Sequence, residues 1–128
     1  MIYLLDTHTF LWFINDDNAL SPTAKAVITN PENILYLSIA SLWEIAIKVS
    51  LGKLEVPSPF SEFMLEQLHK NAIELSAIKP EYTGTLITLP FHHRDPFDRL
   101  IIAQSLNEGI PVIGRDEIFD RYGVQRRW

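Results

Sequence analysis

Short apolar runs alternate with longer amphipathic stretches along this chain. The apolar runs are bounded by polar or turn-forming residues, which predicts strands. Between them, apolar positions recur with helical spacing, as at Leu42, Ile45 and Val49. Alternating strands and helices predict βαβ units, and therefore an α/β fold in which helices cover both faces of a parallel sheet. The runs that predict strands are residues 2–5, 34–37, 72–75 and 110–113.

Capping residues set the bounds of the predicted helices. Ser21-Pro22 and Asp95-Pro96 each place a capping side chain before a proline, which is well tolerated at the first helical position. Ser38 gives a similar start signal, and Gly52 and Gly109 follow helix ends. The predicted helices span residues 10–14, 22–30, 39–51, 60–69, 78–88 and 96–107, a last helical turn covers 119–122, and we interpret the tail 124–128 as an edge strand.

Length and composition narrow the class of protein. The 128 residues fit one domain, residues 1–128, that can bury a sizeable core. No apolar run approaches the ~20 residues of a membrane span, and the absence of cysteine is typical of a reducing cytoplasm. We therefore expect a cytoplasmic protein that does not enter a membrane. The net charge of −5 argues against a general nucleic-acid-coating protein, unless acidic groups hold divalent cations.

The most informative stretch is the charged loop that enters the helix predicted at 96–107. Asp95 reads as its N-cap, and Asp98 falls in the first turn. Apolar residues from Leu100 to Leu106 cover most of the helix circumference, which predicts burial. Asp98 has no lysine four residues later, so its carboxylate needs a partner from elsewhere in the fold.

Four acids occupy positions from which they could form a site. Asp6 ends the first strand and Asp116 follows the fourth, so both should lie at the carboxyl edge of the sheet, where α/β proteins bind ligands. Asp98 begins the helix that leads into the fourth strand. Glu44 lies in an apolar helical run, with Lys48 four residues later, so a surface ion pair and a role in the site both remain open.

A cluster of carboxylates without cysteine suits the hard cations Mg²⁺ and Mn²⁺. Such ions promote hydrolysis of phosphodiester bonds. Arg94, Arg99 and Arg115 flank Asp98 and Asp116, and could either steady a phosphate group or neutralise the acids.

The chain resembles PIN-domain ribonucleases, specifically the VapC-type toxins of bacterial and archaeal toxin–antitoxin pairs. The match follows the order and spacing of the family over essentially the whole chain. It is carried by Leu4-Leu5-Asp6-Thr7-His8, Ser38-Ile39-Ala40-Ser41-Leu42-Trp43-Glu44-Ile45, His93-Arg94-Asp95-Pro96-Phe97-Asp98-Arg99-Leu100-Ile101-Ile102-Ala103 and Gly114-Arg115-Asp116.

The resemblance implies a three-layer α/β/α domain with a central parallel sheet in the order 3-2-1-4-5. It also implies a Mg²⁺- or Mn²⁺-dependent endoribonuclease, in which Asp6, Glu44, Asp98 and Asp116 are the catalytic, metal-binding acids. Asp95 is assigned to capping or to support of these acids. The implied partners are an RNA substrate, a VapB-like antitoxin and a second copy of the chain in a homodimer, with promoter DNA reached only through the antitoxin.

Other classes with an α/β form fit less well. A receiver-type signalling domain needs paired acids after the first strand, and a dehalogenase-like phosphatase needs Asp-x-Asp there, whereas this chain has Asp6-Thr7-His8. A catalytically silent PIN-like binding module remains the alternative.

Overall fold

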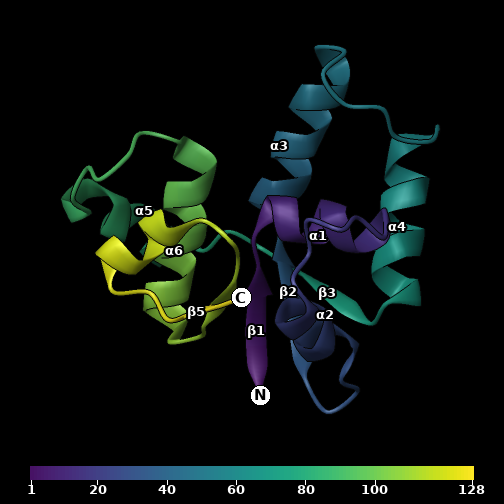
Figure 1. Ribbon diagram of the computed structural model, residues 1–128. Helices are drawn as coiled ribbons and strands as arrows, with labels where there is room; N and C mark the ends of the chain where they lie inside the picture. The colour runs from purple at the N-terminus through teal and green to yellow at the C-terminus, as the bar shows by residue number, and fades with distance from the viewer.

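A five-stranded sheet organises the computed structural model, which describes residues 1–128 (Figure 1). Its strands are β1 (Ile2–Leu5), β2 (Ile34–Ser38), β3 (Ile73–Ser76), β4 (Val112–Ile113) and β5 (Arg126–Arg127). The order is β3-β2-β1-β4-β5, and every neighbouring pair is parallel. The carboxyl ends of all five strands therefore meet at one edge, with β1 in the centre.

Helices cover both faces of this sheet. One face carries α1 (Thr7–Ile14), α2 (Pro22–Thr29), α3 (Ile39–Ser50) and α4 (Phe60–Lys70), the other carries α5 (Pro80–Thr88) and α6 (Pro96–Glu108), and the 3-10 helix η1 (Glu117–Tyr122) precedes β5 (Figure 1). This arrangement confirms the predicted α/β/α layers and the predicted strand order.

The central strand is buried on both faces, as its continuous apolar sequence predicts. Tyr3 and Leu5 join the larger core beneath α1 to α4, whereas Leu4 points to the smaller core beneath α6. Burial on both sides fixes the position of β1 and of the residue that follows it, Asp6.

Several boundaries differ from the predicted ones, most of them by one or two residues. The first helix begins at Thr7 rather than at residue 10, because Asp6 caps it by accepting a hydrogen bond from the Thr7 N–H at 2.9 Å. The fourth strand covers only Val112–Ile113, and Pro111 before it has no N–H to donate. The last helical turn is longer and begins at Glu117. The tail does form an edge strand, which pairs with β4.

Helix α6 presents Asp98 at the carboxyl edge of the sheet. Asp95 caps its start, and Gly109 ends it in the left-handed conformation at φ 66°. Ile101 and Ile102 are buried as predicted, but Leu106 is 40% exposed. The helix therefore buries most of its circumference but leaves a strip of its last turns facing solvent.

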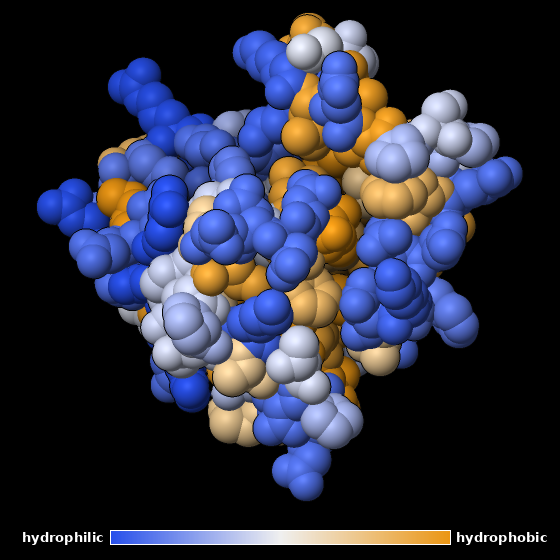
Figure 2. Space-filling view, turned by 45° about the vertical axis from the view of Figure 1, so that its right-hand side comes forward, coloured by the Kyte–Doolittle hydropathy of each residue, from blue (hydrophilic) through white to orange (hydrophobic).

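Figure 2 shows hydrophobic side chains gathered where the ends of α3 and α4 project from the molecule. Leu51, which follows α3, is 62% exposed, and Trp43 within α3 is 60% exposed. None of the helices combines the length and the apolar character that are needed to cross a membrane.

Candidate active site

A cleft of about 460 Å³ lies at the carboxyl edge of the sheet. Asp6, Asp98 and Asp116 all line it, although they come from three separate segments of the chain. The structure thus brings together three of the four predicted acids. The fourth, Glu44, is buried nearby on α3 and does not line the cleft itself.

Asp6 is held in place by its position at the end of β1. One of its oxygens, Oδ1, accepts the hydrogen bond from Thr7, and a Cβ at Gly114 would lie only 3.2 Å from the Asp6 Cβ. Burial raises the pKa of Asp6 to about 7; the Thr7 N–H opposes this shift, and the negative charge of Glu44 adds to it. The Asp6 carboxylate therefore lacks a positive partner.

Asp98 is in a similar state. Burial raises its pKa to about 8, and the negative charges of Asp6 and Asp95 add to the effect. The only cationisable group within 4 Å of its carboxyl is His93, whose Nε2 lies 3.5 Å from Asp98 Oδ2. Two adjacent acids with raised pKa values are typical of a functional site.

The sequence left two alternatives open for Glu44, an ion pair with Lys48 and a place in the site, and the structure shows features of both. Glu44 Oε2 forms an ion pair with Lys48 Nζ at 3.0 Å, but the glutamate is buried rather than on the surface. Its other oxygen, Oε1, is buried and has no hydrogen-bond partner. Burying a carboxylate oxygen without a hydrogen-bond partner costs free energy. Glu44 Oε1 is therefore a candidate to bind a cation or a hydrogen-bond donor.

Asp116 and Asp95 act as helix caps. Asp116 Oδ1 accepts a hydrogen bond from the Ile118 N–H at 3.0 Å, and the negative charge of Asp116 raises the pKa of both Asp6 and Asp98. Asp95 Oδ1 accepts from the N–H groups of Phe97 and Asp98, at 2.9 and 3.1 Å. The predicted capping role of Asp95 is therefore confirmed.

The donor set suits a divalent cation, but its side chains do not form a ready-made cage. No three of the His, Asp and Glu side chains converge closely enough to hold a metal ion. The unpaired Glu44 Oε1 and the raised pKa values of Asp6 and Asp98 nevertheless fit the chemistry of a hard cation, which would supply the missing positive charge. A hard cation that binds here would therefore be held by one or two carboxylates and would keep several water ligands.

The three arginines that flank Asp98 and Asp116 in the sequence differ in their interaction partners. They are Arg94, Arg99 and Arg115. Arg99 is buried and donates to the carbonyl oxygens of Pro90 and Leu89, at 2.8 and 3.0 Å, so neither a phosphate nor an acid is its partner. Neither Arg94 nor Arg115 forms an ion pair. The reading in which these arginines neutralise Asp98 and Asp116 is therefore wrong.

Arg115 is the only lysine or arginine that lines the acidic cleft. Its guanidinium lies over the ring of Trp12, 4.7 Å from the ring centroid, and Trp12 also contacts His8. This contact holds an exposed cation beside the acids without neutralising them.

Thr7, the residue after Asp6, does not face the cleft with a free hydroxyl. Its hydroxyl donates to Ser41 Oγ at 2.9 Å and so links α1 to α3.

Sequence reasoning missed Tyr122, whose hydroxyl lies 2.8 Å from His93 Nδ1. No local signal identifies it, because it lies 29 residues from His93 in the chain.

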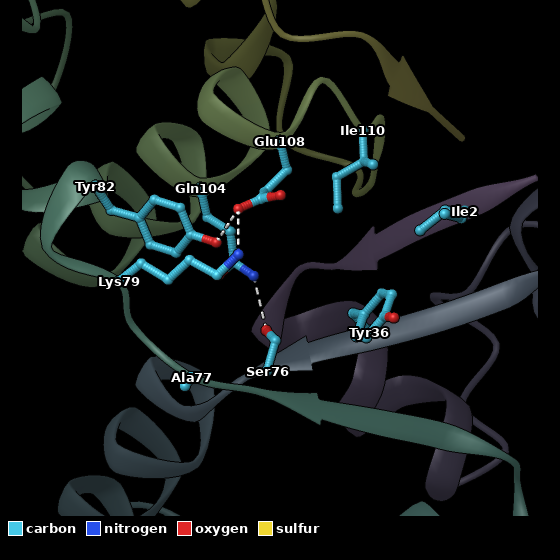
Figure 3. A pocket seen from close by; sticks show the side chains of 9 residues that line it. All are labelled: Ile2, Tyr36, Ser76, Ala77, Lys79, Tyr82, Gln104, Glu108 and Ile110. Carbon is cyan, nitrogen blue, oxygen red and sulfur yellow. Dashed lines mark hydrogen bonds and ion pairs between the residues drawn. The ribbon is translucent and has the colours of Figure 1, made fainter.

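A second hollow, of about 290 Å³, lies between the sheet and helices α5 and α6 (Figure 3). Its acid already has partners, because Glu108 accepts from Tyr82 and Lys79. Gln104 donates through Nε2 to Ser76, whereas its Oε1 is buried without a partner. The hydrogen bonds from Tyr82 and Lys79 hold the pKa of Glu108 below its usual range. This hollow therefore has no acid available for a cation, unlike the cleft at the carboxyl edge.

The class of protein follows from the parallel sheet, the acids at its carboxyl edge and a family match over most of the chain. The sequence profile of the PIN domain matches residues 3–125, and the chain belongs to the PIN domain family.

Particular relatives are similar over nearly the full length. Ribonuclease VapC22 of Mycobacterium tuberculosis is 27% identical over 114 residues, which cover 88% of this chain and 85% of the relative. Two solved structures show the same fold. They are VapBC2 from Rickettsia felis bound to a DNA fragment from their promoter (TM-score 0.70, 17% identity, 98% of this chain and 97% of that chain) and VapBC-1 from nontypeable Haemophilus influenzae (TM-score 0.64, 17% identity, 98% and 96%).

Proposed function

We propose that this protein is a metal-dependent endoribonuclease that acts as the toxin of a VapBC-type toxin–antitoxin pair. The observation that carries the proposal is a cluster of acids with too few positive partners: Asp6 has none, Asp98 has only His93, and Glu44 pairs with Lys48 through one oxygen. Asp6 and Asp98 have pKa values raised to about 7 and 8, and Glu44 Oε1 has no partner. A cation that binds there would relieve all three unfavourable states, which supports a role in phosphodiester hydrolysis.

Asp6, Glu44, Asp98 and Asp116 are the groups that would hold Mg²⁺ or Mn²⁺. When bound, such an ion supplies positive charge that stabilises a phosphate under attack and lowers the pKa of water. Asp6 and Asp116 each have one oxygen fixed as a helix cap, which orients the carboxylate and leaves the second oxygen for a ligand. Glu44 offers Oε1 in the same way.

Arg115 is the group that would bind the RNA backbone. It stands on Trp12 at the rim of the acidic cleft and has no acidic partner, so its charge is available to a phosphate. We propose that Arg115 draws the phosphodiester toward the acids, against the repulsion that the negative charges of the cleft exert.

The proposed partners are a VapB-like antitoxin and a second copy of the chain. A structure with the same fold, VapBC-5 from Mycobacterium tuberculosis, is described as a member of the VapBC family of toxin–antitoxin systems, and VapBC2 is described as bound to promoter DNA. Exposed apolar side chains on and after α3, such as Trp43 and Leu51, offer surface for a protein partner. We propose that promoter DNA is contacted only through the antitoxin, and that the protein acts in the cytoplasm.

One observation favours a second candidate, a PIN-like binding module without catalysis. No three acidic or histidine side chains converge on a metal position. The two candidates differ in whether divalent metal switches on cleavage of RNA.

Cleavage of total cellular RNA by the purified protein tests the proposal. With Mg²⁺ or Mn²⁺ the wild type should give discrete fragments, and EDTA or Asp98→Asn should abolish them, because each removes cation binding. Glu117→Gln is the matched control, since Glu117 is an exposed acid that lines the same cleft but is not a proposed ligand. Cleavage that survives EDTA or Asp98→Asn, or the absence of any cleavage by antitoxin-free protein, would contradict the proposal.

A further inference from the structure

The loop before α6 is anchored to the rest of the fold by the hydroxyl of Tyr122. The backbone N–H groups of His92 and His93 both donate to this oxygen at 3.1 Å, and Arg99 Nη1 approaches it at 3.3 Å. Arg99 also holds the carbonyl of Pro90, at the start of the same loop. The position of His93 is therefore fixed by partners from both α6 and η1.

These contacts determine which nitrogen of His93 carries the proton. Three N–H donors already converge on the Tyr122 oxygen, which has two lone pairs, so a fourth donor has no place there. The hydroxyl's own hydrogen has one acceptor in reach, His93 Nδ1 at 2.8 Å. Tyr122 therefore donates to Nδ1, and the proton of the neutral imidazole lies on Nε2.

The Nε2–H of His93 then has a single partner. Nε2 is buried, makes no hydrogen bond to any other group, and has Asp98 Oδ2 at 3.5 Å as the one acceptor paired with it, a contact longer than an ordinary hydrogen bond. We propose that Tyr122 and His93 form a relay that positions the Asp98 carboxylate: Tyr122 sets the tautomer of His93, and His93 directs its Nε2–H at Oδ2, which leaves Oδ1 as the free oxygen. His93 is a positioning residue, because it acts through Asp98.

This inference rests on the proposed function, since it concerns how Asp98 is held for a cation. Hydrogen bonds from outside the ligand shell orient carboxylate ligands, and their loss typically lowers metal affinity or activity by about 10- to 100-fold. A relay of this kind fixes the ligand before the cation arrives.

Two substitutions of His93 separate the relay from simple packing. In His93→Gln the terminal amide nitrogen reaches about as far as Nε2 and can still donate to Asp98. In His93→Asn the shorter amide reaches only about as far as Nδ1, so it keeps a partner for Tyr122 but loses the donor to Asp98. His92→Asn is the control, because the His92 ring packs on Tyr122 and is not paired with Asp98.

The affinity for Mn²⁺, measured by calorimetry on folded protein, is the deciding quantity. We expect His93→Asn to bind Mn²⁺ about tenfold more weakly, and His93→Gln and His92→Asn to remain within about twofold of the wild type. Equal affinity in all four proteins would overturn the relay while leaving the proposed function intact. A wild type that binds no Mn²⁺ would overturn the proposed function itself.

The tautomer can be measured without any variant of His93. In ¹⁵N-labelled wild type, nitrogen NMR of the imidazole should show Nδ1 unprotonated and Nε2 protonated, and Tyr122→Phe should lose this preference. A wild-type spectrum with the proton on Nδ1 would overturn the relay even if cleavage of RNA is confirmed.

Discussion

The surroundings of Asp98 raise the pKa of its carboxyl far above that of an ordinary aspartate. Asp98 lies in the first turn of a buried helix, with Asp6 and Asp95 as negative neighbours, and its pKa rises to about 8. The folded protein therefore holds a proton that an ordinary aspartate would release. Because the folded and unfolded chains bind this proton with different affinities, the free energy of unfolding depends on pH.

The free energy of unfolding of the metal-free protein should fall as the pH rises from about 4 to about 8. Between the usual pKa of 3.8 and the folded value, the native state binds a proton that the unfolded chain releases, so stability is lost as Asp98 ionises. Asp98→Asn should be more stable than the wild type by up to ~5 kcal/mol at about pH 9, and about equal to it near pH 4. Urea unfolding in EDTA measures the difference.

Glu117→Gln provides the comparison for this titration. It changes an acid at the same cleft and should follow the wild type at every pH. If Asp98→Asn also followed the wild type, Asp98 would not be the proton-holding group.

Arg115 gives a separate prediction about the substrate. Arg115→Ala should raise the KM for RNA about tenfold with kcat nearly unchanged, because it removes a charged contact made equally in the bound and transition states. Arg121→Ala, which removes an exposed arginine outside the cleft, should leave KM unchanged. Steady-state cleavage of a short fluorescent RNA measures both. A fall in kcat alone would place Arg115 among the catalytic groups instead.

The acids could be predicted from sequence because each stands at a recognisable position. Asp6 and Asp116 follow strands and Asp98 follows a cap-proline pair, and all three reach the same cleft. The state of Glu44 could not be predicted, because its unpaired oxygen depends on what surrounds α3 in the fold. The partners of Arg99 were equally hidden, since they are backbone carbonyls of a preceding loop. The catalytic and metal-binding roles of the acids stay predictions.

Helix caps determine how the acids are presented. Asp6 caps α1, Asp95 caps α6 and Asp116 caps η1, so the loops at the carboxyl edge are stabilised by the same kind of residue that forms the cleft. A cap contributes to helix stability by satisfying free N–H groups. Loss of a cap should also make a metal-binding side chain in the first turn of the helix, such as Asp98, more mobile.

Two cap substitutions separate stability from function. Asp95 caps α6 and Ser21 caps α2. Asp95→Ala and Ser21→Ala should each lower the free energy of unfolding by ~1 kcal/mol. Only Asp95→Ala should also slow RNA cleavage, by about tenfold, because Asp95 holds the backbone N–H of Asp98. Thermal unfolding and cleavage rates of both variants test this. Equal losses of activity would show that lowered stability alone explains the effect.

Local patterns predicted the elements better than their ends. Caps and prolines placed α2, α3 and α6 well, since those signals are local. The start of α1 was placed too late, because Asp6 was read as the end of a strand while it also caps the helix. The order of the strands depends on contacts between distant residues, and it followed from the resemblance to a family rather than from periodicity.

The charge of the protein as a whole explains why a cation matters. The net charge is −5, and four acids line the cleft that would receive a polyanion, with Glu44 buried beside them. Without bound cations this edge would repel RNA, and the proposed divalent ion would reverse the local field. That residues 1–128 act as a single domain stays a prediction, consistent with one sheet that carries every strand.

The most direct test is calorimetric titration of metal-free wild type with Mn²⁺ at about pH 7, repeated in buffers of different ionisation enthalpy. Because the pKa values of Asp6 and Asp98 are about 7 and 8, binding should release about one proton, and Asp98→Asn should bind much more weakly and release less. Binding without proton release, or with equal strength in Asp98→Asn, would show that the cation does not bind these acids, and would contradict the account of the site.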